Sequence, residues 1–444
     1  MKKQTDVIKA FGTRGGIRAP HRKNTAEEES LLLPTPQSVA IPLQMHIGAP
    51  CTAIVNPGDS VLVGQKIADS DAFVSAPIHA SVSGTVKEIR KITVAGGGLC
   101  DAIAIESDGA MAPVETVPPD VHDAASLANA ARECGLVGLG GAGFPTHIKL
   151  RIPEGKRINT LIVNVAECEP YLTADYREVI ENSWDIMSGI YAIKKYLGIH
   201  RVLIAVESNK PEAIEILSKI AKNEEADPNN EVSVLRLKAR YPQGAEKVLI
   251  RACTGRRVPP GKLPADVGCI VLNVTSVATL ARYLKTGMPL TKKRITVDGG
   301  GIASPKNVIV PIGTSVGDVL RFVGVAEDTA KVLYGGPMMG LTVASEDMVI
   351  TKNNNGLLAF GENEARLPEP GACIRCGNCL DVCPMALAPA LMEKAVLRKD
   401  LAQLEKLDLL NCMECGCCSY GCPAHRPLVQ TFRLGKSLLK EKKK

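Results

Sequence analysis

The pattern of hydrophobic and polar positions changes several times along the chain. After Ile54, the stretches VNPGDSVLVGQKIAD and SAPIHASVSGTVKEIRKI alternate apolar and polar residues in short runs. Asn-Pro-Gly-Asp and Ser-Gly, which favour turns, separate these runs. Alternation with a period of two between turn signals predicts short β-strands, so we expect an all-β module here.

This all-β module resembles the barrel-sandwich domains that carry lipoyl or biotin. No Met-Lys or Asp-Lys pair stands at a hairpin tip to be modified. A structural role is therefore expected instead of a swinging arm, since a fold alone does not assign a function. We place an N-terminal barrel-sandwich domain at residues 1–115.

Between Pro118 and Leu284, apolar runs alternate with segments of helical periodicity. The runs are TLIVNV at 160–165, RVLIAV at 201–206, VSVLRL at 232–237 and CIVLNV at 269–274. This alternation predicts a Rossmann-like parallel sheet with crossover helices at residues 116–288. One helix follows Tyr176, and its apolar face consists of Val179, Ile186, Ile190, Ile193 and Leu197.

The sequence from Lys292 returns to strands with one short helix, which indicates a small β-grasp module at residues 289–350. Its glycines Gly335, Gly336 and Gly340 are turn and packing positions, because no strand-to-helix step surrounds them. The charged, Asn-rich stretch 352–369 predicts a linker. A cysteine-rich domain is expected at 351–435, followed by a solvated basic tail at 436–444.

Length and composition agree with a multidomain globular protein. A chain of 444 residues with 45% hydrophobic content exceeds the size of one core. The net charge of +6 is modest for this length and does not suggest nucleic acid as a partner. No stretch approaches the roughly 18 apolar residues that a membrane-spanning helix needs, and the start lacks a signal-peptide core, so we expect a cytosolic chain.

The cysteines are concentrated near the end of the chain. Of the 15 cysteines, nine lie between Cys373 and Cys422. In a reducing compartment this density favours metal ligation over disulfides. The spacing C-x2-C-x2-C-x3-C-P occurs twice, and in two-cluster ferredoxins the fourth cysteine of each copy ligates the other cluster.

We therefore expect a helical, ferredoxin-like domain with two [4Fe–4S] clusters. The predicted ligands of one cluster are Cys373, Cys376, Cys379 and Cys422. The predicted ligands of the other cluster are Cys412, Cys415, Cys418 and Cys383. A zinc ribbon is disfavoured because it needs only four sulfurs, and Cys417 is surplus to the pattern.

Iron–sulfur clusters accept one electron at a time and cannot accept a hydride, whereas flavin exchanges both. The loop GLVGLGGAGFPTHIKL is a candidate flavin site, because Gly138, Gly140, Gly141 and Gly143 remove side chains and let backbone N–H groups approach a ligand. Glycine-rich loops are also common as plain turns, so both interpretations stay open at this point.

At this loop the chain resembles a known family. GGAGFPT with the following Lys149, NVAECEPYLTADYRE, YPQGAEKVLI and NVTSVATL are similar, in the same order, to segments of the complex I NADH-binding (51-kilodalton) subunits. Nearly the whole chain, including GGIRAPHRKNT from Gly15, resembles the C-subunit family of the Rnf complexes, the ion-translocating ferredoxin:NAD+ oxidoreductases.

The resemblance implies FMN, NAD(H) and a set of binding residues. The residues expected along FMN, with Lys149 near its phosphate, are Gly138, Gly140, Gly141, Ala142, Gly143, Lys149 and Asn273. The residues expected along the flavin and nicotinamide pocket are Asn164, Glu167, Glu169, Gly244 and Glu246. Leu139 and His147 replace the Arg and Gly usual in complex I, which leaves the nicotinamide contacts open.

The same resemblance implies a peripheral subunit on the cytoplasmic face of a membrane complex, with membrane-embedded and ferredoxin-accepting subunits as partners and a soluble-ligand-binding (SLBB) β-grasp domain. One alternative is a soluble flavin/iron–sulfur reductase of the cobalamin-reductase type, against which the GGIRAPH segment argues. Another is a non-catalytic electron-relay adaptor, which would hold clusters without flavin.

Overall fold

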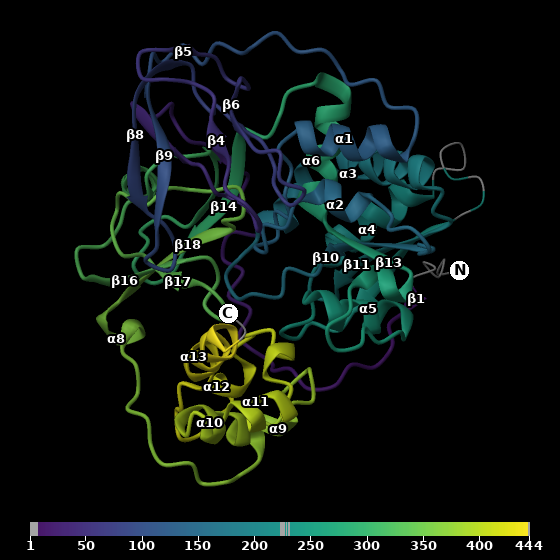
Figure 1. Cartoon of the computed structure of the whole chain (residues 1–444), viewed down its shortest axis with the longest axis vertical. Coiled ribbons are helices and arrows are strands. Elements are labelled where there is room, and N and C mark those ends of the chain that lie inside the picture. Colours follow the sequence, from purple (N-terminus) through teal and green to yellow (C-terminus); the bar gives the residue numbers. More distant parts are fainter. Residues whose placement is uncertain (1–7, 223–226, 228, 230, 443–444) are drawn as a thin grey trace.

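A computed structural model describes residues 8–222, 227, 229 and 231–442 of the chain. Figure 1 shows three α/β and β regions in the upper part of the molecule and a separate helical domain, drawn in yellow, below them. No helix within these ranges is long and apolar enough to cross a membrane.

The barrel-sandwich region consists of two small antiparallel sheets. One sheet has the order β3-β9-β8-β5 and the other the order β4-β6-β7. The strands are β3 (Ser38–Pro42), β4 (Thr52–Ala53), β5 (Ser60–Val61), β6 (Lys66–Asp69), β7 (Ile78–His79), β8 (Gly84–Thr93) and β9 (Leu99–Ser107). The predicted all-β module is thus confirmed, with Val61, Ile67 and Ile103 among its buried residues.

The second region is a five-stranded parallel sheet with helices on both faces, as the apolar runs predict. Its strand order is β1-β12-β11-β10-β13. The strands are β1 (Ile8–Lys9), β10 (Thr160–Val165), β11 (Arg201–Glu207), β12 (Val232–Leu237) and β13 (Cys269–Asn273). The helices are α1 (Ala124–Glu133), α2 (Thr146–Leu150), α3 (Ala174–Leu197), α4 (Pro211–Ala221), α5 (Glu246–Thr254), α6 (Val274–Thr286) and the 3-10 turn η1 (Pro264–Val267).

Successive residues of a central strand pack into two different hydrophobic cores, one on each face of the sheet. Leu161 and Val163 pack in the core that contains the predicted apolar face of α3, whereas Ile162 packs with Leu249 of α5. Figure 1 shows α5 on the opposite side of the sheet from α1, α3 and α6. Burial on both faces explains why these strands are continuous apolar runs.

The third region is a six-stranded mixed sheet of β-grasp type in the order β17-β16-β18-β14-β15-β2. Its elements are β2 (Leu31–Leu32), β14 (Lys292–Asp298), β15 (Lys306–Pro311), α7 (Val316–Val323), β16 (Thr329–Tyr334), β17 (Leu341–Thr342), β18 (Gly356–Gly361) and α8 (Glu362–Ala365). The linker prediction for 352–369 is wrong where β18 pairs with β14 and β16. The short apolar strand β18 directly follows the Asn-rich turn and is stabilised by its pairing with β14 and β16.

The cluster domain is helical, as predicted. It contains α9 (Asn378–Asp381), α10 (Pro389–Leu397), α11 (Leu401–Lys406), η2 (Leu409–Asn411), α12 (Cys417–Tyr420) and α13 (Leu428–Glu441). Part of the expected basic tail belongs to α13, which ends at Glu441. The predicted domain boundaries stay predictions; β1, β2 and β18 pair with strands across them.

Candidate functional site

The glycine loop, residues 138–143, lies where the parallel strands end. A Cβ on Gly140 would stand 3.0 Å from Nδ2 of Asn273, the residue that ends β13 and caps α6. The amide of Leu139 donates to Oγ of Ser276 at 3.0 Å, which fixes the loop to the first turn of α6. The carboxyl ends of parallel strands are the usual ligand position in such sheets.

The backbone of this loop suits a flat ring or a phosphate. Gly140, Gly141 and Ala142 are exposed, and no described residue accepts a hydrogen bond from their amides. Gly141 has φ +114°, and a Cβ there would have no neighbour closer than Nδ2 of Asn355 at 4.0 Å. Three adjacent free N–H groups on an open turn can donate to an anion or to a flavin.

A buried polar network supports the loop from below. Asp175 accepts from Nδ2 of Asn273 at 2.7 Å, and its own amide donates to Oε1 of Glu167 at 2.6 Å. Burial raises the pKa of Asp175, while the ammonium group of Lys293 opposes that rise. Lys293 itself donates to the carbonyl of Leu139 at 3.0 Å, and burial lowers its pKa to about 8.

The other predicted pocket residues form pairs around the same strand ends. Nδ2 of Asn164 donates to the carbonyl of Gly244 at 2.9 Å, which links β10 to the turn before α5. Nζ of Lys149 lies 2.6 Å from Oε1 of Glu246 and also donates to the carbonyl of Val271 at 3.1 Å. The Lys149 charge, expected near a phosphate, is thus balanced by Glu246 in this structure.

The two glutamates of the acidic segment face different partners. The carboxylate of Glu167 caps the start of α3 by accepting from the amides of Asp175 and Tyr176. The carboxylate of Glu169 accepts from the amide of Met338 at 3.0 Å in the β-grasp region. Burial raises the pKa of each carboxyl to about 7, which makes both groups costly to keep charged.

Two asparagines that are absent from the predicted site contact the loop. Nδ2 of Asn353 donates to the carbonyl of Gly141 at 3.2 Å, and a Cβ on Gly143 would lie 3.3 Å from the same Nδ2. Asn355 approaches Gly141 and has a buried Oδ1 without a partner among the described atoms. The run of three consecutive asparagines could have indicated a binding site, but it was interpreted as part of a linker.

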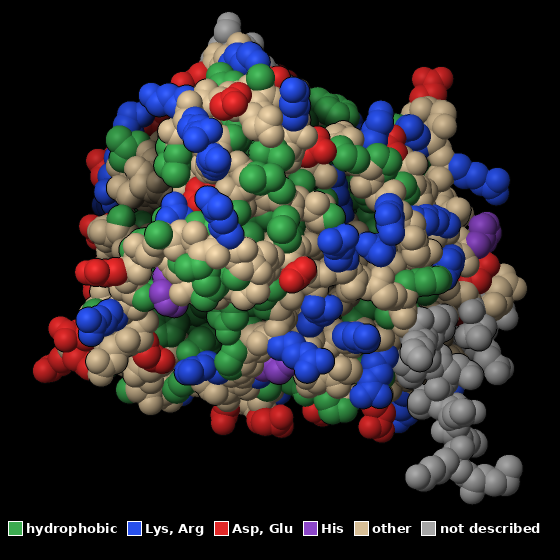
Figure 2. Space-filling model, turned by 90° about the horizontal axis from the view of Figure 1, so that it is seen from below, with side chains coloured by type: hydrophobic (Ala, Val, Ile, Leu, Met, Phe, Trp, Pro, Cys, Tyr) green, Lys and Arg blue, Asp and Glu red, His purple; other side chains and the backbone are tan. Residues whose placement is uncertain are grey.

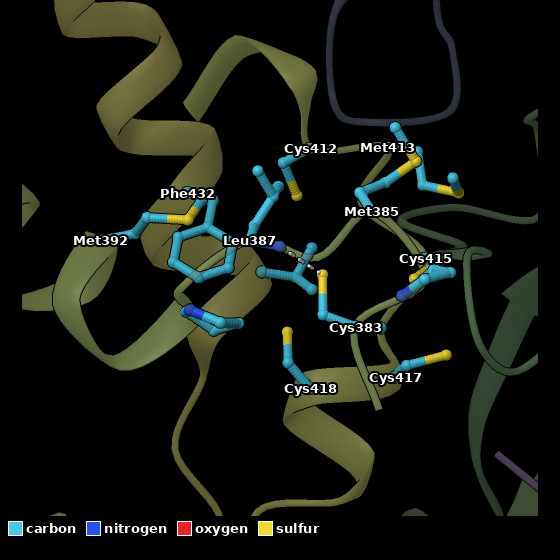
Figure 3. Close-up of a pocket in the computed structure, with 14 residues that line it drawn as sticks. Cys383, Met385, Leu387, Met392, Cys412, Met413, Cys415, Cys417, Cys418 and Phe432 are labelled. Carbon is cyan, nitrogen blue, oxygen red and sulfur yellow. Dashed lines mark hydrogen bonds between the residues drawn. The ribbon is translucent and has the colours of Figure 1, made fainter. Parts of the chain in front are cut away.

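The second ferredoxin motif and the last cysteine of the first motif share one cavity. Cys383, Cys412, Cys415 and Cys418 all line it, together with apolar Leu387, Met392 and Phe432. Figure 3 shows the sulfurs of Cys383, Cys412 and Cys418 directed toward the hollow between these side chains. The structure therefore brings together the four cysteines that the crossed ligation pattern groups.

Cys417 also lines this cavity, but its Sγ points away from the hollow and stands 3.8 Å from the carbonyl of Tyr241. Among the described residues, no three His, Cys, Asp or Glu side chains are grouped around a single-ion position. A four-iron cluster is larger than an ion, so its sulfurs stand farther apart around it.

The remaining predicted ligands are nearer the surface. Cys373 and Cys376 are exposed, and Cys379 and Cys422 are half-buried. Burial raises the pKa of the Cys379 thiol, and the neighbouring Cys422 and Cys373 add to that rise. A Cβ on Gly421 would lie 3.5 Å from the side chain of Val382, so the end of the second motif lies beside the first motif, as crossed ligation requires.

A parallel α/β domain with an open glycine turn, joined to a helical domain with two sets of four cysteines, defines an electron-transfer protein that combines flavin with iron–sulfur clusters. The chain is 43% identical over 439 residues to the C subunit of the proton-translocating ferredoxin:NAD(+) oxidoreductase complex of Clostridium ljungdahlii, covering 97% of this chain and 94% of that protein. It belongs to this family of C subunits of ion-translocating oxidoreductases, the RnfC family.

Two further relatives also align with nearly the whole of this chain. The C subunit of the Na(+)-translocating ferredoxin:NAD(+) oxidoreductase complex of Acetobacterium woodii is 39% identical over 433 residues, covering 95% of this chain and 96% of that protein. The C subunit of the ion-translocating oxidoreductase complex of Rhodobacter capsulatus is 37% identical over 448 residues, covering 98% of this chain and 84% of that protein.

Family models match three parts of the chain. They are the RnfC barrel sandwich hybrid domain at 11–110, the Nuo51 FMN-binding domain at 131–282 and the 4Fe-4S dicluster domain at 367–423. The cofactors FMN and [4Fe–4S] predicted from the sequence are thereby confirmed, and the zinc alternative fails. The match at 11–110 also counts against the cobalamin-reductase alternative.

Chains of solved structures share the fold. A chain of the NAD+-reducing [NiFe]-hydrogenase in the H2-reduced state aligns with a TM-score of 0.51 at 20% identity, covering 72% of this chain and 63% of that chain. At this identity the likeness concerns the fold alone.

Proposed function

We propose that this chain is the subunit in which NAD(H) exchanges a hydride with FMN at the 138–143 loop, and from which single electrons pass through two [4Fe–4S] clusters. The overall step is balanced when NADH loses a hydride, two clusters gain one electron each and one proton is released. Bound flavin supplies the chemistry that connects the two-electron and the one-electron side.

One observation carries this proposal: the three free amides of Gly140, Gly141 and Ala142 on an open turn at the strand ends. These N–H groups would hold FMN, and the Asn273 side chain beside Gly140 would fix its position. Asn164 and Gly244, joined at 2.9 Å, would form the adjacent wall of the flavin and nicotinamide pocket.

Lys149 and Glu246 form a salt bridge, and each would bind a different part of the ligands. The salt bridge of 2.6 Å keeps the ammonium group at the end of β13. A phosphate of FMN would compete for that cation and would release Glu246 toward a ribose hydroxyl. Glu167 and Glu169 are assigned to the nicotinamide side, where their backbone shapes the pocket and their carboxylates hold the α3 start and the Met338 turn.

The cysteines divide into a buried and an outer cluster site. Cys383, Cys412, Cys415 and Cys418 would hold the buried cluster, whose apolar walls exclude water. Cys373, Cys376, Cys379 and Cys422 would hold the outer one. Figure 2, seen from the side of the cluster domain, shows hydrophobic side chains among many Lys and Arg side chains, which suits docking of acidic redox partners.

We further propose that the partners are the membrane-embedded and ferredoxin-accepting subunits of an Rnf complex, and that the chain is peripheral on the cytoplasmic face. Family membership supports this assembly. Ion translocation would be carried out by other subunits, since no helix in the described ranges spans a membrane.

The test is an anaerobic purification followed by measurement of FMN and iron per chain and of NADH-driven reduction of an artificial acceptor. We expect one FMN, about eight irons for two [4Fe–4S] clusters, and activity that requires the flavin. Iron without flavin and without NADH oxidation would favour the non-catalytic adaptor and would overturn the proposal.

A further inference from the structure

The segment 15–25 contains the GGIRAPHR motif, and none of the roles above uses it. It does not enter the barrel-sandwich sheets. Figure 1 shows the purple chain after β1 passing between the parallel-sheet region and the yellow cluster domain. We call this segment the strap, because it contacts three separate parts of the electron-transfer site.

The first contact is with the buried cluster site. Gly15 has φ +64°, and a Cβ on it would lie 2.6 Å from the backbone carbon and oxygen of Cys383. The amide of Gly16 donates to the carbonyl of Val382 at 2.8 Å. Only a glycine permits this approach, so the strap touches the backbone of a predicted cluster ligand directly.

The second contact is with the segment that precedes Gly244. Ile17 and Tyr241 exchange two backbone hydrogen bonds, of 2.7 and 3.0 Å. Both side chains are buried in one apolar cluster with Cys415 and Cys417. A crevice lined by the strap, Tyr241 and Pro384 marks the junction of the two domains.

The third contact is with the acidic segment. Nζ of Lys23 donates to the carbonyls of Glu167 and Glu169, each at 2.8 Å, and to that of Leu172. The amide of Tyr171 donates to the carbonyl of His21 at 2.9 Å. One ammonium group thus gathers three carbonyls of a turn whose backbone shapes the nicotinamide side of the pocket.

We propose that the strap is a positioning element that fixes the flavin pocket relative to the buried cluster, with Gly15 setting the contact to Cys383 and Lys23 setting the acidic segment. This inference rests on the proposed function. Electron transfer needs the two cofactors held at a constant separation, and the strap is bonded to the protein on both sides of that separation.

The test compares Gly15→Ala with Gly12→Ala in the purified holoprotein. Gly12 is a control close by in the chain, since its φ lies outside the left-handed region and a Cβ there would meet nothing within 4 Å. For Gly15→Ala we expect unchanged FMN and iron content and an unchanged rate of flavin reduction by NADH. Because electron tunnelling slows as the distance between two cofactors grows, cluster reduction is expected to slow severalfold.

Hydrogen exchange provides a readout that is independent of turnover. Release of the strap frees the amides of Gly16, Ile17 and Tyr241, so their exchange is expected to accelerate in Gly15→Ala and to stay unchanged in Gly12→Ala. Equal exchange and equal cluster reduction in the two variants would overturn the proposal. Wild-type protein without FMN would instead overturn the proposed function, while the exchange result would still decide the strap.

A second variant decides the question if Gly15→Ala loses its clusters. Lys23→Met keeps an unbranched side chain as far as the ε position and removes the Nζ donor to the three carbonyls. We expect it to retain iron and to raise KM for NADH at least about tenfold while the EPR spectrum of the reduced clusters stays unchanged. A wild-type KM in Lys23→Met would refute the positioning role.

Discussion

Gly141→Ala tests the flavin loop with a single methyl group. Gly141 has φ +114°, and a Cβ there would meet no protein atom closer than 4.0 Å. The substitution therefore causes backbone strain of about 1–3 kcal/mol but no clash within the protein. Gly58 is a matched control, because it has φ +96° and a Cβ on it would also meet nothing within 4 Å.

The two variants are expected to lose similar stability and to differ in flavin affinity. If the ring or phosphate of FMN contacts Gly141, the added methyl overlaps it at a cost of about 1–3 kcal/mol, which corresponds to a Kd about 5- to 150-fold weaker. Gly58→Ala, in a turn of the barrel-sandwich region, leaves Kd unchanged.

The assay is FMN titration of deflavinated protein by fluorescence quenching, together with iron content and a denaturation curve. Iron is expected to stay at the wild-type level in both variants, because no residue of the loop lines the cysteine cavity. A Gly141→Ala protein that binds FMN within twofold of the wild-type Kd would show that the loop does not contact the flavin.

Three other predictions follow from contacts in the structure. Cys383→Ser should lose one cluster. The double variant Cys383→Ser/Cys412→Ser should lose no further iron, whereas Cys383→Ser/Cys373→Ser should lose both clusters. Equal iron losses in the two double variants would refute crossed ligation. Burial lowers the pKa of Lys352 from 10.5 to about 8, so the unfolded state binds more protons than the folded state between these pH values. The unfolding free energy of the wild type, relative to that of Lys352→Met, should therefore rise by up to about 3 kcal/mol from pH 8 to 10.5. A difference in unfolding free energy that does not change with pH would contradict this. Gly189→Ala would place a Cβ 2.4 Å from a backbone oxygen of α6 and should lower the unfolding free energy by about 1–3 kcal/mol, and an unchanged denaturation midpoint would disprove this packing.

Much of the fold could be predicted because local patterns report burial. Strand β10 begins and ends where the run 160–165 does, since strands buried on both faces of a parallel sheet are nearly continuous apolar runs. The linker prediction failed for the opposite reason. Lys352 and its neighbouring asparagines are polar, yet Lys352 is buried and donates to the carbonyls of Pro77 and Gly135.

The candidate site shows the same division. The cysteine motifs and the glycine loop can be recognised in the sequence. Cluster ligation needs cysteines at short separations, and close approach of the backbone to a ligand needs glycines. Asn353 could not be assigned to the loop from its neighbours, since its contact with Gly141 joins positions 212 residues apart.

The sequence by itself determined the cofactor class and the order of the regions, and it predicted the two groups of cysteine ligands. Tertiary structure alone decided that residues 15–25 lie between the pocket and the buried cluster site. The bonds of Lys23 to Glu167 and of Gly16 to Val382 connect distant parts of the chain and leave no local periodicity. Such contacts exist only once the separate cores have formed and brought their surfaces together.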